Sequence, residues 1–251
     1  MDKMIFTSLN SIRNLYDQRF NIAQNLANIS VPGYRRELPN EGSSAFLSQY
    51  EQLGPRAYAL ETGPSTFSFK KGSISVTENK TDISVVNDSF LLAADNNGEI
   101  FFTRRGDLIV TSEGNLENGA GEKILNENLD PIQLPYFSDI KISRIGEIML
   151  DTASTPSGVF TSYGIIGSAN PSLYKLSKDL DGKIKNFNGV EIVSDQSAEF
   201  MQGALEMSNV NPVEEMVASI DNQRQFELNM KLIKSAEEAD RSGSALLRIS
   251  Q

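Results

Sequence analysis

Three residue types are absent from this chain of 251 residues. It contains no cysteine, no histidine and no tryptophan. Without cysteine and histidine, the chain cannot form disulfides, thiolate nucleophiles, Cys/His zinc sites or serine–histidine–aspartate triads. The lack of cysteine gives no sign of an oxidising compartment, although it does not exclude one.

Long apolar runs are missing as well. No stretch approaches the roughly 18 apolar residues that a membrane-spanning helix requires. The opening residues, MDKMIFTSLNSIRNLYDQ, lack the unbroken apolar segment of a cleaved secretory signal. If the protein leaves the cytoplasm, we therefore expect a dedicated exporter, without signal cleavage and without a membrane span.

The chain is acidic, with a formal net charge of −10 and a pI of about 4.7. A free nucleic-acid-binding protein needs a basic face, so the composition does not favour that class and we expect no nucleic-acid partner. Hydrophobic residues make up 39% of the sequence, which is enough for a folded core in a chain of this length.

Residues 4–29 have helical periodicity. Pro32 disfavours helix at the residue before it, and Gly33 permits a backbone turn, so we expect the helix to stop in NLANISVPGYRRE. Asn25 and Asn28 lie three residues apart at the predicted end of this helix. The heptad positions of this helix are Ile5, Leu9, Ile12, Tyr16, Arg19, Ala23 and Leu26, and all but the arginine are apolar.

The C-terminal part carries a second helical pattern, which begins in SNVNPVEEMVASI at residues 208–220. Asn211 suits the N-cap, Pro212 suits the first helical position, and Glu214 completes an arrangement similar to a capping box. One apolar face follows, formed by Val213, Met216, Val217 and Ile220 and then by Phe226, Met230 and Ile233.

The middle of the chain, at about residues 68–203, has a β pattern. Short β-branched and aromatic runs alternate with Asn-Asn-Gly, Arg-Gly-Asp and Glu-Gly-Asn turns, which predicts successive hairpins. Further hairpins are predicted in IKISRIGEIML and LYKLSKDLDGKIKNFNG. Residues 35–67 contain three prolines and several glycines, which indicates an extended arm or linker.

Together these patterns predict an α+β fold. Residues 1–34 and 204–251 form long N- and C-terminal helical assembly segments that pair as a coiled coil, and residues 68–203 form a central all-β domain of short antiparallel strands. Opposite charges favour the pairing, since residues 1–36 carry five basic and two acidic side chains, whereas residues 205–251 carry five basic and eight acidic ones. An alternative is that both helices lie on the β domain.

No pattern in the chain indicates catalysis or a bound cofactor. Residues 177–188 resemble part of a calcium loop, but Ser177 and Asn188 occupy the first and twelfth ligand positions, so a hairpin turn is the better interpretation. The RRGD sequence at 104–107 is interpreted as a solvated hairpin turn rather than an adhesion motif. We therefore expect no enzyme, no metal and no cofactor, although a hydrolase built from distant carboxylates stays open as an alternative.

Three blocks resemble the rod and hook proteins of the bacterial flagellar basal body. NIAQNLANISVPGYRRE is similar to that family's asparagine-rich helix end followed by threonine-Pro-Gly-aromatic, with Val31 in place of the threonine. TDISVVNDSFLLAADNNGEIFFTRRGDLIVTSEGNL is similar to the family's central block. GALEMSNVNPVEEMVASIDNQRQFELNMKLIKSAEE resembles its C-terminal block, and the three occur in the family's order.

The resemblance implies a structural subunit of the flagellar rod, most like the proximal-rod protein of the F type. It implies export by the flagellar type III apparatus, a rod position in the periplasm, and copies of itself and other rod proteins as partners. The alternatives are the distal-rod protein of the G type, a hook-like subunit, or a secreted coiled-coil adhesin or effector. The predicted assembly interface is Ile5, Leu9, Ile12, Tyr16, Ala23, Asn25, Leu26, Asn28, Pro32, Gly33, Tyr34, Ser208, Asn209, Val210, Val213, Met216, Ile220, Phe226, Met230 and Ile233.

Overall fold

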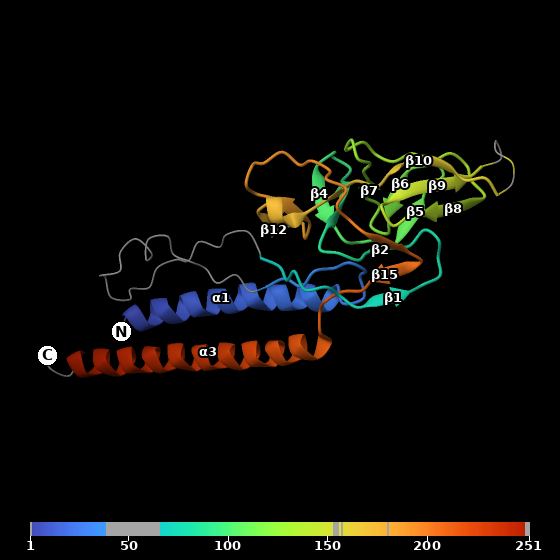
Figure 1. The fold of residues 1–251 in the computed structure, drawn as a ribbon. Coiled ribbons are helices and arrows are strands. Elements are labelled where there is room, and N and C mark those ends of the chain that lie inside the picture. Colours follow the sequence, from blue (N-terminus) through green and yellow to red (C-terminus); the bar gives the residue numbers. More distant parts are fainter. Residues whose placement is uncertain (1, 39–65, 153–155, 157, 180, 249–251) are drawn as a thin grey trace. The chain divides into compact units, whose positions relative to one another are not determined.

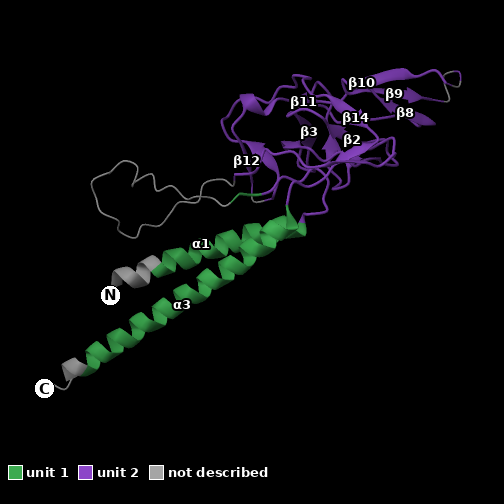
Figure 2. Ribbon diagram, turned by 60° about the horizontal axis from the view of Figure 1, so that its bottom comes forward, with its two compact units in different colours: residues 1–27, 37–65, 211–251 green, residues 28–36, 66–210 purple. Residues whose placement is uncertain are grey.

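The computed structural model describes residues 2–38, 66–152, 156, 158–179 and 181–248, without the side chains of residues 2–7 and 246–248. The chain divides into two compact units, which Figure 2 shows in different colours. The described residues of the helical unit are 2–27, 37–38 and 211–248, and those of the β unit are 28–36, 66–152, 156, 158–179 and 181–210. The predicted arm at 35–67 lies largely outside the described residues.

The helical unit consists of α1 (Asp2–Ala27) and α3 (Pro212–Arg248), which lie side by side and run in opposite directions (Figure 1). The predicted start of α3 is confirmed, because the Asn211 side-chain oxygen accepts the Val213 backbone N–H at 3.0 Å. The Asn211 amide also donates to the Glu214 carboxylate at 3.1 Å, so both ends of the cap side chain are satisfied. The turn after α1 follows the prediction too, since Gly33 has φ of +69°.

The described part of the β unit contains short strands and the 3-10 turn η1 (Pro171–Leu173). The strands are β1 (Ile74–Val76), β2 (Ile83–Val85), β3 (Phe90–Ala94), β4 (Ile100–Thr103), β5 (Leu108–Val110), β6 (Leu116–Asn118), β7 (Lys123–Ile124), β8 (Asp139–Ile142), β9 (Glu147–Asp151), β10 (Thr161–Ile165), β11 (Ser168–Ala169), β12 (Leu176–Lys178), β13 (Ile184–Asn186), β14 (Phe200–Gln202) and β15 (Ala204–Glu206).

All the strand pairs in the described chain are antiparallel, and they form one large sheet and three small ones. The large sheet has the order β12-β13-β4-β3-β7-β6-β5, with β11 also paired to β3. A second sheet has the order β10-β9-β8, and the two-stranded ribbons are β1-β15 and β14-β2. The predicted α+β class with a central antiparallel β region is thus confirmed.

The strand β3 lies at the centre of the core, because all five of its residues are buried. Alternate residues of a strand point to opposite faces. Leu91 and Ala93 pack into one hydrophobic cluster, whereas Phe90, Leu92 and Ala94 pack into another. Both faces of β3 are therefore covered, which explains why FLLAA is a continuous apolar run.

Most of the predicted hairpins are confirmed, and one is wrong. The pairs β3-β4, β5-β6, β8-β9 and β12-β13 are antiparallel neighbours across the predicted turns. The Arg-Gly-Asp segment is not a solvated hairpin turn, because β4 and β5 lie apart in the sheet order. Gly106 instead accepts the Ile83 N–H at 2.9 Å, and Arg105 pairs with Asp107 in a half-buried position. The chain therefore crosses β2 here rather than reversing.

Candidate assembly site

The seam between α1 and α3 is polar for much of its length. The Asn222 amide donates to the Leu15 carbonyl at 3.0 Å, and the Asn229 amide donates to Ser11 Oγ at 3.0 Å. The buried side chains of the pair include Ser8, Leu15, Asn222 and Ala236. The helices thus contact each other through small and hydrogen-bonded residues, with few large aliphatic ones.

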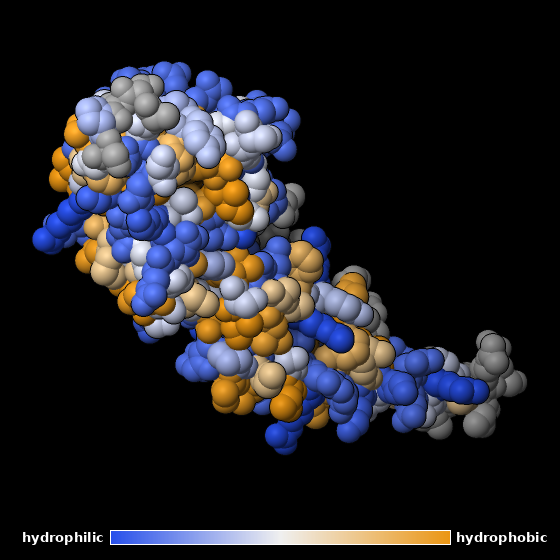
Figure 3. Space-filling view, turned by 90° about the vertical axis from the view of Figure 1, so that its right-hand side faces the viewer, coloured by the Kyte–Doolittle hydropathy of each residue, from blue (hydrophilic) through white to orange (hydrophobic). Residues whose placement is uncertain are grey.

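Only the first part of the predicted apolar stripe of α3, Val213 to Ile220, points away from α1, since Phe226 contacts Tyr16 of α1. At 100° per residue, Val217 and Ile220 lie on the opposite side of the helix from Asn222. Val213, Met216 and Ile220 are all exposed, with Ile220 at 68%. Figure 3 shows that apolar side chains, in orange, are interspersed with hydrophilic ones on the molecular surface. Among the positions that follow, Phe226 and Ile233 are half-buried and Met230 is exposed.

The predicted stripe of α1 is turned partly towards α3 and partly towards solvent. Ile12 and Leu26 are half-buried, whereas Leu9 is 56% exposed and Ala23 is also exposed. Tyr16 is exposed, with its ring edge-on to Phe226 at 5.7 Å between centroids. The side chain of Ile5 lies outside the described residues. The contact with α3 therefore uses only one edge of the heptad stripe.

At the end of α1, Asn25 is buried and bound within its own chain. Its amide donates to the Glu37 carbonyl at 3.0 Å, and its oxygen accepts the Glu37 N–H at 2.8 Å. The same amide lies 3.4 Å from the Glu215 carboxylate on α3. Asn25 thus holds the returning backbone against the start of α3. Its neighbour Asn28 is half-buried, and its carbonyl accepts the Val31 N–H at 3.2 Å.

In the β unit, the residues after α1 make a close backbone contact. Gly33 donates its N–H to the Glu206 carbonyl at 2.7 Å. A Cβ at Gly33 would overlap the Arg104 carbonyl group and would come within 2.5 Å of the Arg105 nitrogen. The positive φ and the lack of space both require glycine at this position. The adjoining Pro32 is half-buried.

A buried ionic cluster lies beside this contact. Glu206 pairs with Arg35 at 2.9 Å and with Arg104 at 2.6 Å, and the three side chains are between 0% and 3% exposed. Burial lowers the pKa of Arg35 to about 10, an effect that the adjacent Glu206 carboxylate partly offsets. Two cations share one anion, and the Phe90 ring lies 6.0 Å and 5.7 Å from the two guanidinium carbons. The negative face of the Phe90 ring attracts both guanidinium groups, which helps to stabilise the positive charge that Glu206 alone does not balance.

The segment before α3 is tied to the same region. Asn209 donates its backbone N–H to the Tyr34 carbonyl at 3.3 Å, and its side-chain oxygen accepts the Arg36 N–H at 2.6 Å. Its amide donates to the carbonyls of Ser68 and Lys70. Segments 34–36 and 68–70 are therefore both hydrogen-bonded to Asn209.

The other predicted residues in this region support the same connection. Val210 is buried, and the half-buried Ser208 accepts the Val210 N–H on its hydroxyl at 3.3 Å. The Tyr34 ring is half-buried, and the Lys178 ammonium lies 3.8 Å from its centroid. Such a contact is a cation–π interaction, which holds Tyr34 against β12.

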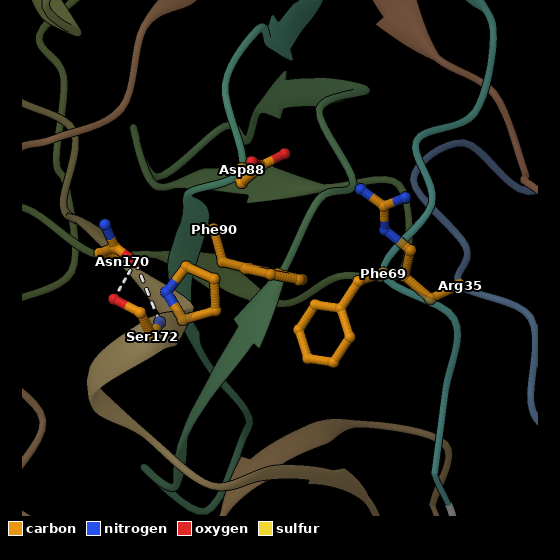
Figure 4. A pocket seen from close by; sticks show the side chains of 7 residues that line it. Arg35, Phe69, Asp88, Phe90, Asn170 and Ser172 are labelled. Carbon is orange, nitrogen blue, oxygen red and sulfur yellow. Dashed lines mark hydrogen bonds between the residues drawn. The ribbon is translucent and has the colours of Figure 1, made fainter.

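A cavity of about 540 Å³ opens next to Arg35 (Figure 4). It is lined by Arg35, Phe69, Asp88, Phe90, Asn170, Pro171 and Ser172. Arg35 is buried and bound to Glu206, whereas Asp88 is exposed and pairs with Lys71 at 3.0 Å. The charged groups at the cavity have both signs, so they do not define one ligand chemistry.

The segment that resembles a calcium loop is a β hairpin in which a lysine binds the carboxylates. Lys185 contacts Asp179 at 2.8 Å, Asp181 at 3.4 Å and Glu99 at 2.9 Å. These carboxylates raise the pKa of Lys185 well above its ordinary value. The predicted hairpin turn is thus confirmed, and the lysine occupies the place between the two aspartates.

Neither α1 nor α3, as far as each is described, is apolar enough over a sufficient length to cross a membrane.

Comparison with known proteins finds similarity to flagellar basal-body rod proteins. Residues 201–246 match the model described as the flagellar basal body rod FlgEFG protein C-terminal. The flagellar basal-body rod protein FlgF of Salmonella typhimurium is 28% identical over 262 residues, with both chains covered completely. FlgF of Buchnera aphidicola from Schizaphis graminum is 28% identical over 99% of each chain. FlgG of Borreliella burgdorferi is 26% identical over 86% of this chain and 88% of its own.

The matching relatives are flagellar rod proteins, which supports the prediction of a structural protein rather than an enzyme. These matches support the flagellar basal-body rod protein family for this chain. Relatives named FlgF match it from end to end, which supports the FlgF type within that family.

The sequence analysis did not single out several residues of this region. Arg35, Arg104 and Glu206 form the buried cluster, although each is an ordinary charged residue in its own stretch of sequence. Asn222 and Asn229 were not recognised either, because a search for apolar heptads passes over polar positions. Their seven-residue spacing is the signal that would have identified the seam.

Proposed function

We propose that this chain is a rod subunit that polymerises through the exposed apolar stripes of α1 and α3. The main support is the exposed stripe of Val213, Met216, Val217 and Ile220, which lies on the face of α3 opposite the seam with α1. The stripe falls within the segment that matches the rod-protein model. A protein that exposes a contiguous apolar stripe commonly buries it against a partner.

In the proposed rod, copies of the chain and other rod proteins pack their terminal helices against one another. The contact joins different surfaces of successive subunits, so it repeats along a screw axis without closing. Heptad stripes of neighbouring helices pair as coiled coils, and each fully buried aliphatic side chain contributes about 1.5–3 kcal/mol. Many such contacts together resist shear, which lets the rod transmit torque.

The proposed location is the proximal rod, in the periplasm. The name FlgF belongs to relatives that cover 99–100% of the chain, whereas the FlgG relative from Borreliella burgdorferi covers 86%, which favours the proximal over the distal rod. The export route is the flagellar type III apparatus, without cleavage of a signal. The predicted assembly residues at the helix ends, such as Asn28, would support subunit contacts in addition to their contacts within the chain.

The test introduces one carboxylate into each stripe. Leu9→Asp and Ile220→Asp are expected to leave the β unit folded but to prevent incorporation into rods, because a carboxylate buried against apolar neighbours costs several kcal/mol. Gln18→Asp and Gln225→Asp are matched controls, since both glutamines are exposed and lie outside the stripes. Secreted protein, isolated basal bodies and swimming are measured in a strain that lacks the native gene.

The expected result is normal secretion of all four variants, with rods and motility lost only for the two stripe variants. Exported stripe variants that build normal rods would disprove the proposed interface. Loss of the β-unit melting transition in the purified stripe variants would show instead that the stripes belong to the monomer's own core. Defined trimers in solution, in place of open filaments, would favour the secreted adhesin or effector.

A further inference from the structure

The carboxylate of Glu206 contacts three separate parts of the β unit. One oxygen accepts from Arg35, in the segment after α1, and from the backbone N–H of Gly72 at 2.9 Å. The other oxygen accepts from both Nε and Nη2 of Arg104 at 2.6 Å. The backbone carbonyl of the same residue accepts the Gly33 N–H at 2.7 Å. No other residue of the cluster contacts all three parts.

Arg104 connects this carboxylate to the core. Its guanidinium also donates to the carbonyls of Val85, Asn87 and Ser89, which lie at the end of β2 and in the turn to β3. Because Arg104 is fully buried, its position is fixed by these bonds. Glu206 is therefore bound, through Arg104, to the most buried part of the β unit. Its other contacts are with the segments around Arg35 and Gly72.

The peripheral segments are the two places where the β unit continues into helices. Residues 28–36 follow α1, and residues 207–210 precede α3. Glu206 is the last residue of β15 and is followed directly by the second segment. Gly72 also allows close approach, since a Cβ there would overlap the Met207 carbonyl. The two segments that join the β unit to α1 and α3, called the chain exits below, therefore both lie at Glu206.

We infer that Glu206 is the positioning residue of this junction, which fixes the chain exits to α1 and α3 against the core as one rigid piece. All the contacts that support this role lie within a single chain, so the role does not depend on polymerisation. A rigid junction where the β unit continues into α1 and α3 would also serve a torque-bearing rod. That last consequence rests on the proposed function.

The experiment compares hydrogen exchange of purified Glu206→Gln with that of the unchanged protein. Glutamine keeps the shape but removes the charge that both arginines share. Amide exchange in peptides covering residues 33–36 and 70–74 is expected to become at least about tenfold faster, because charge-assisted hydrogen bonds there are weakened. Exchange in β3 and β4 is expected to stay unchanged.

Glu199→Gln is the matched control. Glu199 also pairs with an arginine, Arg144 at 2.7 Å, but both side chains are largely exposed. Exposed pairs contribute little, so local exchange in this variant should change by less than about twofold. Equal local exchange in the two variants would overturn the inference. Faster exchange throughout the β unit of a still-folded Glu206→Gln would overturn it as well.

Arg35→Met keeps the inference testable if Glu206→Gln does not fold. This change leaves Glu206 and Arg104 as a balanced pair and removes the bonds from Arg35, in the segment after α1, to Glu206 and to the Lys70 carbonyl. Exchange is expected to rise at residues 33–36 but not in β2, β3 or β15. Unchanged exchange at 33–36, or a general loss of protection, would contradict the assigned role. Because neither variant needs assembly for its readout, failure here is distinguishable from failure of the proposed function.

Discussion

Replacing Gly33 by alanine is expected to destabilise the β unit through two separate effects. The residue has φ of +69°, which costs an L-amino acid roughly 1–2 kcal/mol. The new Cβ would also overlap the Arg104 carbonyl group, and overpacking of this kind costs about 1–3 kcal/mol. The combined loss is about 2–5 kcal/mol, which corresponds to a fall in Tm of roughly 4–20 °C for a protein of this size.

Gly98→Ala separates the two effects. Gly98 has φ of +83°, but nothing lies within 4 Å of the Cβ that would be added there. Its substitution therefore carries only the conformational cost, and the difference in Tm between the two variants measures the overlap at Arg104. Thermal unfolding followed by circular dichroism provides the values. If both variants lose the same Tm, Gly33 does not lie against the Arg104 backbone and the described junction is wrong.

Two further predictions concern charged groups of the β unit. The Lys80 ammonium and the Ile140 N–H hold the pKa of Asp139 below its ordinary value of 3.8. The ionised Asp139 therefore stabilises the folded protein above pH 3.8, and this stabilisation is lost as the pH falls through the lower pKa of the folded state. Urea unfolding between about pH 5 and pH 2 should therefore show a smaller acid loss in Lys80→Met; an identical pH profile would contradict this. Calcium should not bind the 177–188 hairpin, whose carboxylates already hold a lysine, and a calorimetric titration with sub-millimolar affinity would refute that.

Features that depend on neighbouring residues could be predicted from the sequence. The cap at Asn211 needs only the residues up to Glu214, and hairpins need only a turn between two β runs. The same local reasoning failed at Gly106, where the turn-like sequence serves a different purpose. Its glycine is required because the Ile83 carbonyl approaches from a distant strand. A local pattern cannot distinguish a turn from such a close approach.

The buried ionic cluster could not be predicted, because it joins residues that are far apart in the chain. Glu206 lies 102 positions from Arg104, and nothing in either stretch indicates burial of a charge. Charged residues are rarely buried, so the expectation for each was an exposed surface position. The pairing follows only once β15 is placed beside the segment after α1. By contrast, Gly33 and Asn209, which were predicted as assembly residues, both lie in this region and make contacts within the chain.

The helix pair reverses the usual arrangement of polar and apolar groups. A stable isolated helical hairpin buries its aliphatic stripe, yet here amides of Asn222 and Asn229 lie in the seam while Val213 and Ile220 face outward. Buried asparagines at heptad positions select register at a cost in stability. The seam therefore fixes the register of α1 against α3 more than it strengthens their association. If another molecule covers the outward stripes, as proposed above, their burial would add free energy beyond that of the seam.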